Sequence, residues 1–340
     1  MLFIKEKNNE EKKKKVFRFF FFKYIKCMSE NLIRESSYAI DRAAKILNKG
    51  GLVSVKAETV YGLACDPGNS EAILKLYNLK NRPSSNPLII HVSSLGMLKD
   101  IAEINTITSS IINLFWPGPL TLILPRRKNK NILDFAVSGL DTVAVRMPSS
   151  EIFLKVIKKF GKPVAAPSAN QSGYISSTKA SHVIESFGKD IELVIDSGQS
   201  EYGLESTIID LSSEKIFIRR LGVIDSEFLE KKLGIKIYDH NESDVSKPNS
   251  PGQSFKHYSP NTPIKLNVKI PEEGDAFLGF GSIKPNHRPF LNLSESADLR
   301  EAAFNLFNFL RKLDKLNKKQ ISIYPIPKKG IGKVINERLN

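Results

Sequence analysis

The chain has 340 residues, which is the length of two domains of roughly 100–200 residues each. Its 51 Lys and Arg residues against 36 Asp and Glu residues give a net charge of +15. This charge favours an anionic partner, nucleotide or nucleic acid, without deciding between them. Two cysteines exclude a disulfide scaffold and a four-cysteine zinc site, and we expect a reduced, cytoplasmic protein.

Residues 1–27 differ in composition from the rest of the chain. They hold nine Lys or Arg and three Glu, a net charge of +6. The apolar run at 19–22 is far shorter than the about 20 residues of a membrane span, and no secretory cleavage site comes after it, so we expect no membrane segment. Two interpretations stay open: a basic, aromatic arm that binds a surface, or a disordered or spurious extension ahead of Met28.

Regular patterning begins near Ser36. The spacing of apolar residues predicts one helix from Ser36 or Ser37 to the stop at Gly50-Gly51, and a second one capped by Ser70. Further helical stretches are predicted near 95–115, 150–160 and 178–187. Strands are predicted near 52–55, 88–92, 120–124, 142–146, 192–196, 206–211 and 215–220. This order is typical of a mixed α/β domain rather than of strict βαβ alternation.

The Ser, Pro, Asn and Gly content of residues 241–262 predicts an interdomain linker. It separates a first domain over 30–240 from a small C-terminal α/β domain over 263–340. In the second domain the pattern predicts a strand at 276–281, an amphipathic helix near 296–316 and a strand at 321–324.

Several common catalytic motifs are absent from the sequence. It has no GxxxxGK[ST], no GxGxxG after a strand, no HExxH or paired CxxC, and no GxSxG. These absences argue against a P-loop protein, a Rossmann dinucleotide site, a zinc enzyme and an α/β-hydrolase. The chemistry must therefore come from polar clusters at strand and helix ends.

Lys80 and Arg82 lie at a predicted helix end, which Pro83 terminates. An ammonium beside a planar guanidinium suits a polyphosphate. Cations at a helix C-terminus also complement the helix dipole without any ligand. Both interpretations stay open at this point.

Two further features have the same ambiguity. Ser168 and Asn170 come after small residues that would let a ligand approach the backbone, but they also suit a simple turn. Arg146 ends an apolar strand, where it must pair with a carboxylate such as Glu58 or Glu205 or receive an anionic ligand. A lone His91 at a strand end is more typical of a core histidine.

Taken in order, these clusters resemble the YrdC-type threonylcarbamoyl-AMP synthases in their long form with a C-terminal domain. The matching segments are 58–63 ETVYGL, 80–83 KNRP, 86–91 NPLIIH, 116–121 WPGPLT, 139–148 GLDTVAVRMP, 166–170 APSAN and 205–209 ESTII. In the linker, SPG at 250–252 and KHYSP at 256–260 are similar to the interdomain motif of the long form.

The resemblance implies an α/β fold: a twisted mixed-sheet YrdC-like domain with an open, concave, basic face, plus a smaller Rossmann-like α/β domain. It implies that L-threonine, bicarbonate or CO2 and ATP, with Mg2+, are converted into threonylcarbamoyl-AMP and pyrophosphate. It also implies a separate threonylcarbamoyl transferase that acts next on tRNA, and a contact with tRNA or double-stranded RNA.

The resemblance also implies a set of site residues. The residues expected to bind ATP are Lys80, Arg82, Asn86, Thr142, Ser168, Asn170, Ser176, Arg220 and Tyr258, the last as a lid. Those expected to bind L-threonine are Thr59, His91, Arg146, Ala166 and Ser206. We expect no covalent nucleophile and no metal-ligating side chain. Catalysis would rest on proximity and on the charges of Lys80 and Arg82.

One departure and one alternative remain. Lys56-Ala57 stands where the family usually has Pro-Thr, and Lys56 could add charge to the site or point outward. The alternative function is a non-catalytic double-stranded RNA-binding or ribosome-maturation protein on the same scaffold. The basic charge fits either function, whereas the retained set of ligand residues favours the enzyme.

Overall fold

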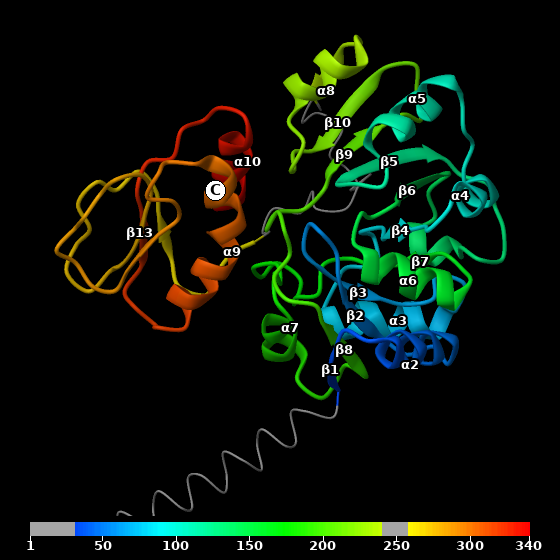
Figure 1. Cartoon of the computed structure of the whole chain (residues 1–340), viewed down its shortest axis with the longest axis horizontal. Helices are drawn as coiled ribbons and strands as arrows, with labels where there is room; N and C mark the ends of the chain where they lie inside the picture. The colour runs from blue at the N-terminus through cyan, green and yellow to red at the C-terminus, as the bar shows by residue number, and fades with distance from the viewer. Residues whose placement is uncertain (1–30, 240–257) are drawn as a thin grey trace, which may run out of the picture.

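The computed structural model describes residues 31–239 and 258–340. The predictions for residues 1–27 and for most of the linker at 241–262 lie outside the described residues. Figure 1 shows a larger first domain with two sheets and a smaller domain formed by the C-terminal part of the chain. Within the described ranges, no helix is both long and apolar enough to cross a bilayer.

A four-stranded sheet begins the first domain. Its order is β1 (Leu32–Arg34), β8 (Leu193–Asp196), β2 (Val53–Lys56) and β3 (Tyr61–Ala64), and β3 is the antiparallel strand. Helices α2 (Ser37–Asn48) and α6 (Glu151–Phe160) pack against each other, and their apolar faces share one core cluster with β2 and β8. The predicted cap is confirmed, since the Ser36 side chain accepts from the Ala39 amide.

A seven-stranded mixed sheet completes the first domain. Its order is β11 (Ile237–Asp239), β10 (Ile216–Arg220), β9 (Thr207–Asp210), β5 (Leu120–Pro125), β6 (Thr142–Arg146), β4 (Ile89–His91) and β7 (Val164–Ala165). Parallel pairs such as β4 with β6 alternate with antiparallel pairs such as β5 with β6. The mixed-sheet prediction is therefore confirmed.

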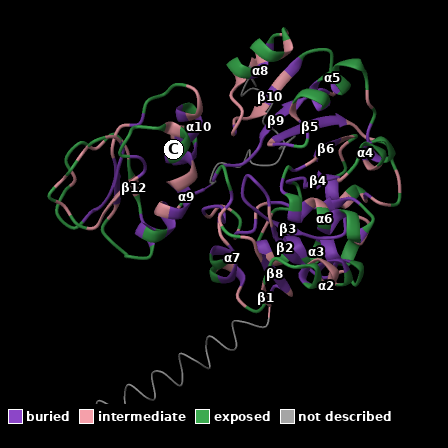
Figure 2. Cartoon of the chain, in the orientation of Figure 1, coloured by how far each residue is buried: buried purple, intermediate pink, exposed green. Residues whose placement is uncertain are grey.

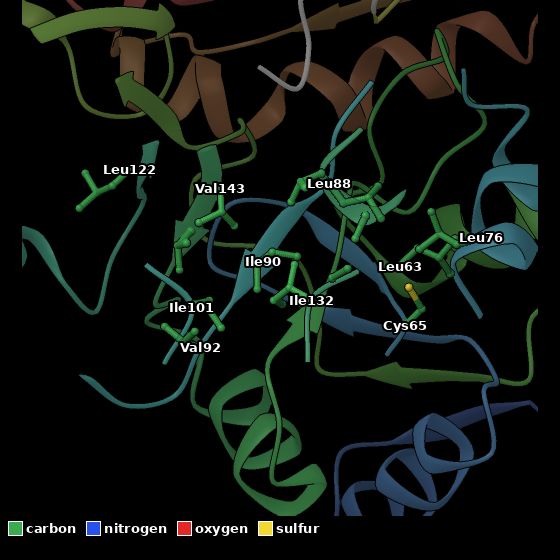
Figure 3. Close-up of a cluster of buried hydrophobic side chains, with 14 of the residues drawn as sticks. Leu63, Cys65, Leu76, Leu88, Ile90, Val92, Ile101, Leu122, Ile132 and Val143 are labelled. Atoms are coloured by element: carbon green, nitrogen blue, oxygen red, sulfur yellow. The ribbon is translucent and has the colours of Figure 1, made fainter. Parts of the chain in front are cut away.

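The two sheets meet along β3. Antiparallel bridges join Gly62 of β3 to Ser168, and Cys65, directly after β3, to Ala165 of β7, so β3 pairs with the edge of the second sheet. Side chains of both sheets belong to one large apolar core, part of which Figure 3 shows: Leu63, Cys65, Leu76, Leu88, Ile90, Val92, Leu122 and Val143. The ends of the strands of both sheets are thereby brought to one place.

The helices between the strands differ in detail from the predictions. Asn69, rather than Ser70, caps α3 (Ser70–Lys80), because its side chain accepts from the Ala72 amide. The predicted stretch 95–115 divides into α4 (Leu95–Ile101) and α5 (Thr106–Phe115), since Asn105 caps a new helix. The predicted helix near 178–187 is α7 (Ala180–Phe187). The sequence analysis did not identify the 3-10 turn Asp134–Val137 or α8 (Ser226–Leu233).

The C-terminal domain is a parallel sheet covered by two helices. The strand order is β12 (Ile264–Lys265), β15 (Ile321–Ile323), β13 (Ala276–Gly279) and β14 (Phe290–Asn292), with every pair parallel. Helices α9 (Leu299–Asp314) and α10 (Ile331–Leu339) lie on the side that faces the first domain in Figure 1. This all-parallel arrangement agrees with the expected Rossmann-like domain.

The two domains share one apolar core. Val60, Ile175 and Leu204 of the first domain belong to the same buried cluster as Leu306 and Leu310 of α9. Helix α9 has buried residues among more exposed ones, as its mixed colouring in Figure 2 shows. The C-terminal domain is therefore packed onto the first domain by side chains and not only joined to it through the chain.

The turn after β10 lies very close to the start of β9. A Cβ atom added at Gly222 would lie 2.3 Å from the Thr207 amide nitrogen and 2.6 Å from the Glu205 carbonyl oxygen. Both are backbone atoms, at and just before the start of β9, so they cannot turn away as a flexible side chain would.

Gly222→Ala should therefore lower the free energy of unfolding by about 1–3 kcal/mol, as overpacking usually does. The control is Gly96→Ala on the exposed face of α4, where the nearest atom to a new Cβ is the Ser94 hydroxyl at 3.6 Å. That change should stabilise the protein by about 0.5–1 kcal/mol. Urea unfolding of both variants measures the difference, and equal effects would contradict the close approach at Gly222.

Candidate functional site

A small cavity of about 50 Å³ lies between strand ends and loops of the first domain, with Tyr258 as a further lining residue. The lining residues are Ala57, Thr59, Val60, Gly62, Arg82, Ile89, His91, Arg146, Phe153, Ala166, Pro167, Ser168, Glu205, Ser206, Arg220 and Tyr258. They come from segments more than a hundred residues apart along the chain.

Nine of the predicted site residues line this cavity. From the predicted L-threonine set they are Thr59, His91, Arg146, Ala166 and Ser206, and from the predicted ATP set they are Arg82, Ser168, Arg220 and Tyr258. The fold thus brings both predicted sets together in one place. Lys80, Asn86, Thr142, Asn170 and Ser176 are not among the lining residues.

Arg146 is held at the end of β6 by three buried partners. Its guanidinium forms an ion pair with the Glu58 carboxylate and donates to the Thr59 hydroxyl at 3.0 Å and to the Gly118 carbonyl at 3.0 Å. Glu58 is therefore the carboxylate that compensates Arg146. Because the Thr59 hydroxyl oxygen already accepts from a cation, its proton is left to donate to a ligand oxygen.

His91 lies next to Arg146 in the register of β4 and β6. Its ring stacks on Phe153 with centroids 5.0 Å apart, and the side chain is buried. Burial, together with the nearby Arg146 charge, holds the pKa of His91 well below its usual 6.5. The imidazole is therefore neutral at physiological pH and offers one donor and one acceptor.

The opposite wall carries two further guanidinium groups. Arg220 donates to the Ser206 carbonyl at 2.9 Å and to its hydroxyl at 3.1 Å, while that hydroxyl also pairs with Thr121 at 2.8 Å. Arg82 donates to the Asn86 side chain and backbone and to the Pro87 carbonyl. Asn86, which does not line the cavity, thus holds the Arg82 guanidinium in place through hydrogen bonds. Both arginines bond to neutral oxygens, so their charges face the cavity uncompensated by these contacts.

The other predicted residues lie behind the wall or away from it. The Lys80 ammonium is buried and donates to the carbonyls of Ser168 and Asn170. Asn170 itself donates to the Gln171 and Tyr174 carbonyls. These contacts shape the loop that presents Ser168.

Ser176 and Thr142 are placed differently from each other. The Ser176 hydroxyl donates to Glu205, a lining residue, at 2.5 Å. Thr142 is the first residue of β6 and Arg146 is the last, so the length of the strand separates Thr142 from the cavity. It stays a predicted ATP ligand without a contact to the other members of the set.

Tyr258 closes the cavity from the side of the C-terminal domain. Its ring stacks on Phe307 of α9 with centroids 5.5 Å apart, and the Arg338 guanidinium of α10 lies 4.6 Å from the ring centroid. The residue has a φ of 67° and is buried. A non-glycine residue in the left-handed region is held there by its surroundings.

Lys56 points away from the cavity, and Ala57 lines it. The Lys56 ammonium lies 2.8 Å from the Glu201 carboxylate at a neighbouring surface hollow. Of the two possibilities raised by the sequence, Lys56 thus does not add charge to the cavity. Ala57 leaves the wall without the hydroxyl that the family pattern has at this position.

The sequence analysis missed Arg338, which reaches the cavity wall from α10. It forms an ion pair with Glu205 at 3.0 Å, and both side chains are buried. No motif pointed to it, because the matching segments ended before the C-terminal domain. A buried arginine within an amphipathic helix was the only signal, and it cannot be told from a solvated one by spacing alone.

Comparisons with known proteins agree with this geometry. Residues 45–222 match a protein family described as telomere recombination, which groups Sua5, YciO and YrdC proteins, and residues 224–340 match a family described as threonylcarbamoyl-AMP synthase, C-terminal domain. The threonylcarbamoyl-AMP synthase of Pyrococcus abyssi is 37% identical over 325 residues, which cover 90% of this chain and 94% of the relative. That of Bacillus subtilis is 33% identical over 317 residues, 88% of this chain and 91% of the relative.

A solved structure of P. abyssi Sua5 complexed with L-threonine superposes with a TM-score of 0.83 at 35% identity, covering 91% of this chain and 96% of that one. E. coli YciO shares the fold of part of the chain, with a TM-score of 0.52 at 20% identity over 58% of this chain and 97% of its own.

The neutral His91 makes a testable prediction about pH. The pKa of His91 is lower in the folded state than in the unfolded chain. Below pH 6.5, His91 is therefore protonated in the unfolded chain but stays neutral in the folded protein. Stability should fall as the pH is lowered through this window. Between pH 7.5 and 5.5, wild type should lose about 1.4 kcal/mol more than His91→Asn. Urea unfolding at the two pH values measures the loss, and an NMR titration of His91 with a midpoint near 6.5 would contradict the prediction.

Proposed function

The chain belongs to the threonylcarbamoyl-AMP synthase family, and we propose that its cavity is where this enzyme joins L-threonine, bicarbonate and ATP. The family makes the chain a nucleotidyltransferase-type enzyme and favours this function over the non-catalytic RNA-binding alternative. One observation supports the proposed location: nine residues of both predicted ligand sets line one cavity.

The L-threonine side of the proposal is formed by Arg146, Thr59 and His91. The threonine carboxylate would accept from the Thr59 hydroxyl, whose oxygen is already bonded to Arg146. A neutral His91 could accept from the amino group without repelling it, as an imidazolium would. Ser206 and the Ala166 backbone complete this side of the cavity.

The ATP side of the cavity is formed by Arg82 and Arg220, and Ser168 lines the same cavity. Burial lowers the pKa of Arg82 to about 10, so the group stays charged at neutral pH. Two guanidinium groups suit a triphosphate, because each can donate two hydrogen bonds to phosphate oxygens. We propose that Lys80, Asn86, Asn170 and Ser176 contribute by holding Arg82, Ser168 and Glu205, and that Thr142 contacts the nucleotide beyond the cavity.

Mg2+ belongs to the proposal as the metal carried by ATP. Among the residues that the structure describes, no three His, Cys, Asp or Glu side chains gather so that they could hold a metal ion. Glu205 lines the cavity, but its two oxygens already bond to Arg338 and Ser176. Magnesium is commonly held by substrate phosphates with few protein ligands, and it would neutralise charge on the leaving pyrophosphate.

The reaction then needs no covalent enzyme intermediate. The threonine amino group adds to bicarbonate with loss of water, and a carbamate oxygen attacks the α-phosphorus of ATP. The bond between the α-phosphorus and the oxygen that bridges it to the β-phosphorus breaks, and pyrophosphate leaves. The protein supplies the proximity of the two ligands and positive charge around the phosphates. A carbamate is sensitive to water, so we propose that the buried Tyr258, which lines the cavity, acts as a lid over the bound nucleotide.

Partners and compartment complete the proposal. The product requires a transferase that moves the threonylcarbamoyl group onto tRNA, and the net charge of +15 would suit a contact with RNA. The free thiol of Cys65 is buried, which fits a reducing compartment such as the cytoplasm.

The direct test is pyrophosphate release from ATP with Mg2+ and bicarbonate, with and without L-threonine. Release should depend on L-threonine. Pyrophosphate release that does not depend on L-threonine, or no pyrophosphate release from folded protein, would overturn the proposal.

Arg82→Ala should lower threonine-dependent pyrophosphate release by about 100-fold or more, because a preorganised donor to the phosphates is lost. Its circular dichroism and melting temperature should stay close to wild type. The control is Arg127→Ala, which removes an exposed arginine bonded only to the Lys99 carbonyl at 3.3 Å. Normal turnover by Arg82→Ala would refute the role.

Thr59→Val keeps the shape of the side chain and removes its hydroxyl. The KM for L-threonine should rise about 10- to 100-fold, the cost of a hydrogen bond to a charged group, and the KM for ATP should change less than about twofold. Steady-state kinetics with each substrate varied in turn separate the two constants. An unchanged KM for L-threonine would remove Thr59 from the site.

A further inference from the structure

One arginine of the C-terminal domain contacts a residue in the wall of the site. Arg338 of α10 is buried and holds Glu205 Oε2 at 3.0 Å through its Nε. Its Nη2 donates to the Leu221 carbonyl at 2.6 Å, and the guanidinium lies over the ring of Tyr258. Glu205, Leu221 and Tyr258 all lie at or beside the cavity, whereas Arg338 itself is not a lining residue.

Glu205 has both carboxylate oxygens engaged. Oε2 pairs with Arg338, and Oε1 accepts from the Ser176 hydroxyl. Burial alone would raise the pKa of this carboxyl, but the positive charges of Arg338 and Arg220 hold it below its usual value. Glu205 is therefore an anion, placed in the wall of a cavity whose proposed ligands are also anions.

Arg220 is the alternative partner for this anion. It lines the same cavity and bonds to Ser206, the residue next to Glu205 in the chain. If Glu205 paired with Arg220, the guanidinium charges facing the cavity from Arg82 and Arg220 would fall from two to one. The pairing with Arg338 keeps both available.

We propose that Arg338 is a positioning residue of the C-terminal domain that draws Glu205 away from Arg220 and so keeps Arg220 free to bind the phosphates of ATP. This inference rests on the proposed function of the cavity, and in particular on Arg220 as a phosphate ligand. It assigns the C-terminal domain a direct electrostatic part in ATP binding. L-threonine binding is not affected, since Arg146 has its own carboxylate, Glu58.

The experiment compares three variants in the full chain. Arg338→Met removes the guanidinium and keeps an unbranched apolar side chain. Arg338→Met with Glu205→Gln removes both charges, so no carboxylate is left to compete for Arg220. Lys333→Met, on the same helix, removes a cation paired at 2.7 Å with Glu227 at the surface, where 47% and 74% of the two side chains are exposed.

We expect Arg338→Met to raise the KM for ATP at least tenfold while the KM for L-threonine changes less than twofold. The double variant should return the KM for ATP to within about threefold of wild type, and Lys333→Met should match wild type. A merely structural role would move both KM values together, whereas the proposed role moves the KM for ATP alone. Threonine-dependent pyrophosphate release by wild type is measured first, because its absence would overturn the proposed function rather than this inference.

The inference is overturned if folded Arg338→Met binds ATP as wild type does, or if the double variant keeps the raised KM for ATP. Loss of Arg338 alone leaves a buried carboxylate without its cation, which can prevent folding. If Arg338→Met does not fold, the variant that combines Arg338→Met with Glu205→Gln decides. A KM for ATP near that of wild type supports the proposal, and a tenfold rise contradicts it. Failure of both variants to fold would also overturn it, because the pair would then serve the fold.

Discussion

The buried ion pair between Glu58 and Arg146 is the contact on which the site depends. Glu58 lies in the turn between β2 and β3 of the four-stranded sheet, and Arg146 ends β6 of the seven-stranded sheet. Neither charge can be left alone in this interior, since removing one partner of a buried pair costs about 3–5 kcal/mol. The pair therefore fixes how the two sheets meet, and the same guanidinium orients Thr59 and the Gly118 carbonyl.

A second layer of contacts comes from the C-terminal domain. Arg311 of α9 lies over the ring of Tyr174 and donates to the Ile175 carbonyl, and Arg338 of α10 makes the matching set of contacts around Tyr258 and Glu205. The guanidinium groups of Arg311 and Arg338 thus both bond to residues of the first domain. The C-terminal domain therefore supports the wall of the cavity from behind, through Glu205 and Tyr258, without lining it.

The sequence predicted the chemistry of the cavity better than its geometry. Arg82, His91 and Ser168 were ambiguous as single residues and were assigned through the family resemblance, because many short motifs in one order are specific. Lys80 and Ser176 were assigned to ATP, but the structure places them behind Ser168 and Glu205, and a motif does not distinguish a residue that touches a ligand from one that holds its neighbour. Strands β1 and β7, of three and two residues, are too short for alternation to be visible. Arg338 could not be found at all, because its partner lies 133 residues away in the chain.

The buried ammonium of Lys80 has a consequence for chemical modification. It donates to two carbonyls of the loop that carries Ser168, and burial together with the nearby Arg82 lowers its pKa. An acetyl group on this nitrogen would remove the charge and leave a single N–H, so the two carbonyls could no longer both be well satisfied. An acetyltransferase that reaches exposed lysines such as Lys158 cannot reach Lys80 in the folded protein. The lysine of the KNRP motif is thus shielded from lysine acetylation by the loop that it holds.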